Sequence, residues 1–232
     1  STGLADQHNQ LNHRDNPTIR GRMVAVCVVA MPLLVMPAVW FARLDGMLAI
    51  IAAFFAAILL AVIVAFRYAD IAPVDANNVM HWLHTFFGIL WIGLLYYLNF
   101  VQVPTMPSVP AELKKGVTGY IAPKVFFFFR YAALLTVVFG LAIAAHKQYL
   151  VDALLFRKGG AVDMIGIGMW LAIIMFFNVW AIIWPMQKKI LGIVEATDEE
   201  KAKATPIALA ASRTNLALSL PMIYCMVAAN LS

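Results

Sequence analysis

The amino-acid sequence predicts an all-α integral membrane protein, a bundle of about six transmembrane helices. The 232 residues are 63% hydrophobic and only 12% charged, whereas a typical soluble domain carries about 25% charged residues. Several apolar runs reach the roughly 20 residues that a helix needs to cross a hydrocarbon core. These runs are too long and too uniformly apolar for the alternating strands of a membrane barrel. Helices therefore remain as the way to satisfy the backbone in lipid.

Polar or proline-containing breaks separate the apolar runs. The predicted spans are 23–42, 47–66, 79–103, 124–146, 162–186 and 207–230. We divide the chain into a polar N-terminal tail (1–22), two N-terminal transmembrane helices (23–78) and a four-helix membrane domain (79–232). The tail has no apolar segment of the kind that a signal peptide requires, and we expect it to be a solvated extension.

The breaks are short compared with the spans. Three prolines between 104 and 110 predict a loop after the third span. The charged stretch 187–206 predicts a solvated link before the sixth span, either irregular or a short surface helix. With six spans, both ends of the chain lie on one side of the membrane. Lys and Arg are almost equally numerous in the loops of the two sides, so the positive-inside rule does not fix the orientation.

The net charge of +5 comes from basic residues scattered among the loops. We therefore expect a lipid bilayer as the partner, and no nucleic acid. The two cysteines, Cys27 and Cys225, lie inside apolar runs and form no CxxC or CxxCH pattern. A zinc site and a covalently attached c-type haem are therefore not expected.

Histidines occur near one side of the predicted bundle. His81 and His84 are spaced i, i+3 at the start of the third span, so they share a helix face and cannot hold one haem from opposite sides. His84 is one turn deeper. We expect it to ligate the iron of a b-type haem, because haem iron is commonly held by histidine.

The same helix face carries further residues suited to a haem. Gly88 follows His84 at i+4 and leaves room for a flat macrocycle, and Trp91 at i+7 can line it. His146, at the end of the fourth span, is the opposite ligand suggested by depth. His81 is an alternative ligand, a neighbour of the ligand or a propionate partner. The alternative for all three histidines is a structural role near a helix end.

A second polar group lies toward the other side of the membrane. Arg130 is several residues inside the fourth span and Arg213 inside the sixth, while Asn178 and Asn215 lie nearer the middle. No Asp or Glu is deep in any span, and an unpaired buried guanidinium is costly. We therefore expect these residues to bind a substrate, haem propionates, a quinone head, a small anion or backbone carbonyls that a helix kink exposes. The alternative is that the arginines extend to the lipid headgroups.

Three groups of residues resemble the urate oxidase N-terminal membrane domain, which occurs in bacterial membrane urate hydroxylases that carry a fused cytochrome c. The first group is His81-Trp82-Leu83-His84, with Gly88, Trp91-Ile92-Gly93 and Tyr96-Tyr97. The second is Asn178-Val179-Trp180, with Ile183-Trp184-Pro185 and Gln187-Lys188-Lys189. The third and strongest is Ser212-Arg213-Thr214-Asn215, with Ser219-Leu220-Pro221-Met222.

The resemblance implies a helical bundle in the bacterial inner (cytoplasmic) membrane, tied to oxidation and electron transfer. It does not extend to the cytochrome, because this sequence contains no CxxCH motif. We expect a haem-b-binding electron-transfer subunit of a larger respiratory or oxidase complex, with other membrane subunits and a cytochrome c as partners. Two alternatives stay open: an oxidoreductase that acts on a small anion such as urate, with Arg213 and Asn215 binding it, and a cofactor-free accessory subunit.

Overall fold

In the computed structural model of the chain, residues 46–67 and 75–229 are described. They contain helices and no strand. The chain divides into two compact units, Ser1–Pro73 and Val74–Ser232. The predicted tail (1–22) and the predicted span 23–42 lie outside the described residues.

The first unit contributes one described helix, α3 (Gly46–Arg67), which confirms a helix at the predicted span 47–66. Its large apolar side chains are exposed, among them Phe55 at 67% and Phe66 at 77%. A helix that is apolar all round suits lipid and not water.

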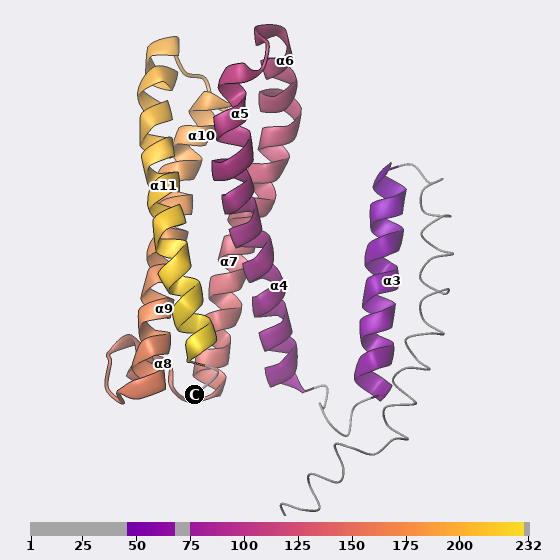
Figure 1. Ribbon diagram of the computed structural model, residues 1–232, viewed down its shortest axis with the longest axis vertical. Coiled ribbons are helices and arrows are strands. Elements are labelled where there is room, and N and C mark those ends of the chain that lie inside the picture. Colours follow the sequence, from indigo (N-terminus) through magenta and orange to yellow (C-terminus); the bar gives the residue numbers. More distant parts are fainter. Residues whose placement is uncertain (1–45, 68–74, 230–232) are drawn as a thin grey trace, which may run out of the picture. The chain divides into compact units, whose positions relative to one another are not determined.

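The second unit, here called the bundle, consists of four long helical segments that run alternately up and down (Figure 1). The first contains α4 (Ala76–Tyr96), the π-helix η1 (Tyr97–Gln102), α5 (Val103–Thr105) and the 3₁₀ turn η2 (Met106–Ser108). The second contains α6 (Ala111–Gly116), the π-helix η3 (Val117–Ile121) and α7 (Ala122–His146). After the short α8 (Leu150–Leu154), the third contains α9 (Gly160–Phe177), the π-helix η4 (Asn178–Ile183) and α10 (Trp184–Ile190). The fourth is α11 (Asp198–Ala228).

The bundle has two ends. We call the end at α5 and α6 the α6 end, and the end at α8 the α8 end (Figure 1). Within the bundle, α4 packs mainly against α7, and α9 against α11. The core between the pairs is apolar. Its largest fully buried apolar side chains are Trp91, Phe129, Leu95, Met175, Ile183 and Val179.

Four helices among the described residues are long and apolar enough to cross a membrane: Leu48–Arg67, Ala76–Ser108, Ala111–His146 and Gly160–Ile190. The longest of these has 36 residues, or about 54 Å at 1.5 Å per residue. It therefore exceeds the roughly 30 Å hydrocarbon core. These helices mark the chain as a membrane protein with bilayer contact. The predicted sixth span belongs to α11, which is not among the four, so the count of six spans stays a prediction.

The helices run further than the sequence pattern predicts. The prolines after residue 103 do not open a loop at once, because the helical path continues to Ser108. The charged stretch 187–206 is mostly helical, with only 191–197 between α10 and α11. The reason at its C-terminal side is a capping box: Thr197 Oγ1 accepts from the backbone N–H of Glu200, and Glu200 Oε2 accepts from that of Thr197.

Each π-helical segment ends two residues before a proline: η1 before Pro104, η3 before Pro123 and η4 before Pro185. In each case the residue just before the proline donates its N–H to the carbonyl five residues back. These bonds join Val103 to Leu98, Ala122 to Val117 and Trp184 to Val179. A proline inside a regular α-helix clashes with the preceding turn, and the wider π-turn accommodates its ring.

Candidate functional site

A row of buried and half-buried polar side chains on α11 joins the helices of the bundle. Ser212, Asn215 and Ser219 are spaced by three and four residues, so they lie on one helix face. Asn215 and Ser219 are fully buried. Buried polar groups need hydrogen-bond partners, and each of these three finds one on another helix.

Asn215 holds the centre of this row. Its Nδ2 donates to the carbonyl of Met175 at 3.0 Å, and its Oδ1 accepts from Asn178 Nδ2 at 3.0 Å. Asn178 is the first residue of the π-helix η4. The structure therefore brings together the predicted pair Asn178 and Asn215, but each amide is engaged by the other.

Two more bonds complete the row. Asn99, in the π-helix η1, donates to Ser212 Oγ and to the carbonyl of Leu95, both at 2.9 Å. Ser219 Oγ donates to Leu216 O at 2.7 Å, so the Tyr96 hydroxyl, 3.1 Å away, is the donor to Ser219. The strongest motif of the sequence thus contains the side chains that tie α11 to its neighbours.

Arg130 has aromatic neighbours in place of a carboxylate. Its guanidinium carbon lies 3.4 Å from the ring centre of Trp184 and 5.5 Å from that of Trp180. Its Nε donates to the carbonyl of Phe126 at 3.1 Å. An arginine over an indole face gains cation–π attraction, which grows when the pair is removed from water. Two indole rings and a backbone carbonyl therefore stabilise the charge of Arg130 in place of an acidic side chain.

Arg213 points away from this group. It is exposed at the middle of α11, on the helix side opposite Asn215, and the structure does not bring it together with Arg130. The expected binding cluster of two arginines and two asparagines is therefore not assembled in the bundle. Its members instead occupy three separate environments: a stacked arginine, a bonded amide pair and an outward-facing arginine.

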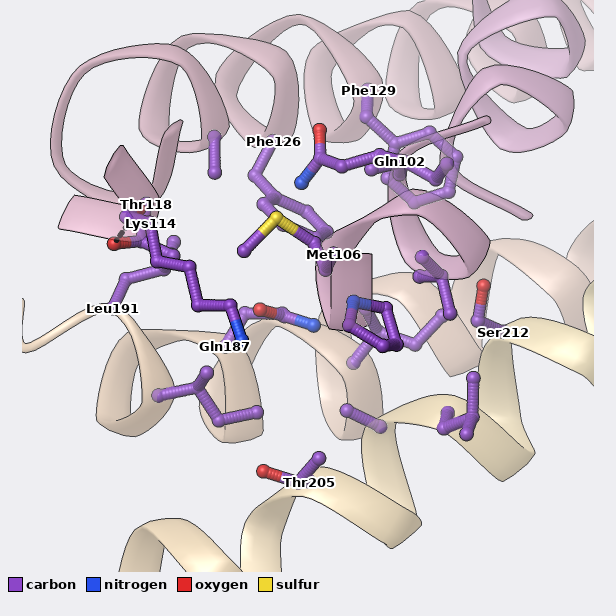
Figure 2. Close-up of a pocket in the computed structure, with 18 residues that line it drawn as sticks. Gln102, Met106, Lys114, Thr118, Phe126, Phe129, Gln187, Leu191, Thr205 and Ser212 are labelled. Carbon is purple, nitrogen blue, oxygen red and sulfur yellow. Dashed lines mark hydrogen bonds between the residues drawn. The ribbon is translucent and has the colours of Figure 1, made fainter. Parts of the chain in front are cut away.

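A cavity of about 430 Å³ lies farther toward the α6 end. It is partly open, and the side chains that line it are mostly apolar (Figure 2). All three π-helical segments contribute to it, through Gln102, Thr118 and Ile183 among others. The polar side chains in its wall are Gln102, Lys114, Thr118, Gln187, Thr205 and Ser212.

Gln102, in the wall of this cavity, has an unsatisfied polar atom. Its Oε1 is buried and has no hydrogen-bond partner among the described residues. Of the five such atoms among the described residues, it is the one whose residue lines this cavity, and an ordered water or a bound group is the usual explanation for such an atom. Sequence analysis named neither Gln102 nor Gln187 as a site residue. The available signal was their spacing, since each lies two residues from a proline that ends a π-turn.

His84 lies toward the α8 end and is tightly held. Its Nδ1 is 2.8 Å from the carbonyl of Thr136 on α7. Gly140, one turn further along α7, makes the fit possible. A Cβ at Gly140 would come within 2.9 Å of His84 Cε1 and 3.1 Å of Nδ1. The ring of His84 therefore occupies the space that a side chain at Gly140 would fill.

The other two candidate histidines lie in different environments. His81 lines the same cavity of about 110 Å³ as His84, as their shared helix face predicts, and its Nδ1 is 2.8 Å from the carbonyl of Asn77. His146 is exposed and does not line that cavity. Tyr149 does line it, and burial raises the pKa of its phenol. The structure does not place His146 opposite His84.

The space expected for a haem beside His84 is filled by protein. A Cβ at Gly88 would meet Thr136 Cγ2 at 3.8 Å, so this glycine faces α7. Trp91 is fully buried in the core. The cavity of about 110 Å³ is well below the roughly 300–1,000 Å³ of ligand pockets. The described residues do not fit an enclosed haem, although the ring of His84 is oriented as a ligand is.

Comparison with known proteins gives one match. Residues 130–232 match the model of a family described as urate oxidase N-terminal. The match confirms the family resemblance over this segment, which holds the Asn178–Asn215 pair and Arg130 with its stacked tryptophans. The segment around His84 precedes it. No curated protein and no solved structure matches the chain significantly.

Proposed function

We propose, from the membership of residues 130–232 in the urate oxidase N-terminal family, that the chain is the membrane-embedded part of an oxidoreductase. The cavity at the α6 end is its binding site, and the ligand is the head group of a quinone, the mobile electron carrier of such membranes. In this proposal the membrane is the bacterial inner membrane. The observation that carries it is the carboxamide of Gln102, which lines the cavity of about 430 Å³ and whose Oε1 has no hydrogen-bond partner among the described residues.

The size and character of the cavity support this ligand. About 430 Å³ lies within the roughly 300–1,000 Å³ range of small-molecule sites, which are mostly apolar with a few placed polar groups. Phe126 and Phe129 are buried aromatic side chains in its wall. They suit the flat ring of a quinone. The open side of the cavity leaves room for a hydrocarbon tail.

The two glutamines supply hydrogen bonds for either redox state. A quinone accepts two electrons and two protons to become a quinol, so its carbonyl oxygens become hydroxyl groups. A carboxamide donates through its nitrogen and accepts through its oxygen. Gln102 and Gln187 can therefore donate to a quinone carbonyl and accept from a quinol hydroxyl. Lys114, the one charged side chain in the wall, adds a donor.

Urate is the second candidate, favoured by the charge of Lys114 and by the family match. A urate anion presents N–H and C=O groups around its whole edge and needs polar partners on every side. The cavity wall is mostly apolar, and a buried polar group left unpaired costs about 1–3 kcal/mol. The wall therefore favours the quinone ring.

Haem-linked electron transfer is kept as a separate proposal, with other membrane subunits and a cytochrome c as electron partners. What favours it is the bond from His84 Nδ1 to Thr136 O, since a ligand histidine commonly donates its other ring N–H to a carbonyl. The cavities that His84 lines, about 30 Å³ and about 110 Å³, are too small for a haem, so this proposal requires a haem that is shared with a partner subunit or a bundle that opens at His84.

The test is ligand binding to the full chain in detergent or nanodiscs. Short-tailed ubiquinone and urate are each titrated, with quenching of tryptophan fluorescence and equilibrium dialysis as the two readouts. Gln102→Leu keeps the size of the side chain and removes its polar atoms. We expect it to weaken quinone binding about tenfold, because one hydrogen bond contributes about 1–1.5 kcal/mol.

Two lysines provide a matched control for the choice of ligand. Lys114 lines the cavity, whereas its neighbour Lys115 is exposed and does not. Lys114→Gln should leave quinone binding within a factor of a few, and Lys115→Gln should change nothing. Tight urate binding that Lys114→Gln abolishes would favour the second candidate. If the wild-type chain binds neither ligand, the cavity is not the site proposed.

A further inference from the structure

Three potential metal ligands from three helices meet at the α8 end. Two small cavities lie there, one of about 30 Å³ and one of about 110 Å³. His84 of α4, Met169 of α9 and Met226 of α11 line both of them. The cavity of about 430 Å³ at the α6 end shares none of these residues.

Two glycines make room for these side chains. Gly140 of α7 lies against the ring of His84, as described above. Gly168 of α9 lies against Met226 of α11, because a Cβ there would come within 3.1 Å of Met226 Cε and 3.4 Å of its Cγ. Met169, the next residue after Gly168, is itself buried. Two close helix contacts thus fix the side chains of His84 and Met226 where they line the cavities.

The hydrogen bond of His84 defines its chemistry. A carbonyl oxygen only accepts, so Nδ1, 2.8 Å from Thr136 O, carries the proton. In the neutral ring the lone pair is then on Nε2. Protonation of one ring nitrogen by a bond to a backbone carbonyl is the usual way to orient a histidine that binds a metal through the other nitrogen.

We propose that this end of the bundle binds a soft monovalent metal ion, Cu(I), through His84 Nε2 and the thioethers of Met169 and Met226. Thioether sulfur is a soft ligand that selects Cu(I) over hard cations. An ion needs little space: a cavity of about 30 Å³ exceeds the roughly 10–15 Å³ needed for one water molecule. The site is therefore large enough for an ion, although it is too small for a haem.

The charge around the site favours a monovalent ion. No Asp, Glu or Cys lines either cavity among the described residues, and Lys147 lines the larger one. A divalent ion such as Zn²⁺ would lack the carboxylate or thiolate ligands that it usually takes in proteins. His81 and Tyr149 are the remaining groups that can titrate in the larger cavity. His81 is a reserve nitrogen ligand, already 2.8 Å from the carbonyl of Asn77.

The experiment is a Cu(I) competition titration of the full chain in detergent. Copper is supplied under anaerobic, reducing conditions, and a chromophoric Cu(I) chelator reports the free ion. We expect one Cu(I) per chain. The double variant Met169→Leu, Met226→Leu keeps apolar side chains of similar size and removes both sulfurs. Its affinity should fall by more than the roughly 10–100-fold that loss of a supporting partner around a metal costs.

Met106→Leu is the matched control, because Met106 lines the cavity at the α6 end and the chemical change is the same. It should bind Cu(I) as the wild type does, and so should His146→Ala. Far-UV circular dichroism and size-exclusion elution verify the fold of each variant. The proposal is overturned if the wild type takes up no Cu(I), or if the double variant binds it with unchanged affinity. Zn²⁺ that displaces Cu(I) stoichiometrically would also contradict it. Quinone binding at the other end should not change in the double variant or in His146→Ala, because none of these residues lines the cavity at the α6 end.

Discussion

Replacement of Gly140 by alanine tests the close contact between α4 and α7. The new methyl group would be built 2.9 Å from Cε1 and 3.1 Å from Nδ1 of the His84 ring. Carbon atoms do not approach so closely without displacement, so the ring must move. The ring is also held at Nδ1, 2.8 Å from the carbonyl of Thr136, one turn before Gly140 on the same helix. A displaced ring cannot keep that bond.

The magnitude follows from three contributions. The lost hydrogen bond costs about 1 kcal/mol, and an extra methyl group in a packed interior typically costs 1–3 kcal/mol. Alanine returns about 1 kcal/mol of helix propensity relative to glycine. We therefore expect Gly140→Ala to lower the free energy of unfolding by about 1–3 kcal/mol.

Gly93→Ala is the control, because we expect it not to lower the free energy of unfolding. Gly93 lies inside α4, and a Cβ there would meet nothing within 4 Å. The same chemical change should therefore be neutral or stabilise the bundle by up to about 1 kcal/mol. The assay is unfolding in mixed detergent micelles, followed by far-UV circular dichroism. If Gly140→Ala and Gly93→Ala unfold at the same denaturant fraction, the contact of His84 with Gly140 does not exist as described.

A double-variant cycle separates the contact from other effects. His84→Ala removes the ring, so adding Gly140→Ala to it should cost little or should stabilise. The coupling free energy between the two positions should be about 1–3 kcal/mol, a size typical of residues in direct contact. Additive effects would show that the cost of Gly140→Ala arises elsewhere.

Three further expectations address other parts of the chain. Asn215→Leu should lower the free energy of unfolding by about 1 kcal/mol, a typical value for a hydrogen bond between membrane helices, and Asn178→Leu added to it should cost little more. The bond from the Thr197 backbone N–H lowers the pKa of Glu200 below its ordinary value of 4.5. The contribution of this carboxylate to the start of α11 is therefore present above pH 4.5 and lost as the pH falls through the lower folded pKa. Amide exchange at Thr197, whose N–H donates to Glu200 Oε2, measures this loss, and Glu200→Gln should remove it. A b-type reduced-minus-oxidised spectrum that His84→Ala abolishes would support haem binding, and a well-folded preparation without haem would argue against it.

Hydrophobic run length was sufficient to predict the helices but not their ends. The run 47–66 corresponds to α3, and the later runs fall inside the long helices of the bundle. The observed helix ends differ from the predicted ones because a π-turn and a capping box extend helices where a proline or a run of charges suggests an interruption. Pro104 reads as the end of a helix, yet a π-turn carries the helix past it. The charged stretch before residue 207 predicts a solvated link that can form a short surface helix, but the long α11 begins within it at the capping box of Thr197.

The site was predictable only where one helix determines it. The shared face of His81 and His84 follows from their spacing, and both line one cavity. The partner of Arg130 could not be found in this way, because Trp184 is 54 positions away in the chain and aromatic rather than acidic. Spacing could not place Met169 and Met226 in the same cavity as His84, because they come from two other helices.

The three π-turns determine which way the pocket residues face. Each π-turn contains one residue more than an α-helical turn would, and one residue rotates a helix by about 100°. Removing a single residue from η1 would therefore turn Gln102 and the helix beyond it by that angle relative to the rest of α4. The same holds for Gln187 beyond η4. Three one-residue insertions thus aim the ends of three helices at a common point, while the residues nearer the α8 end keep the register set by their own packing.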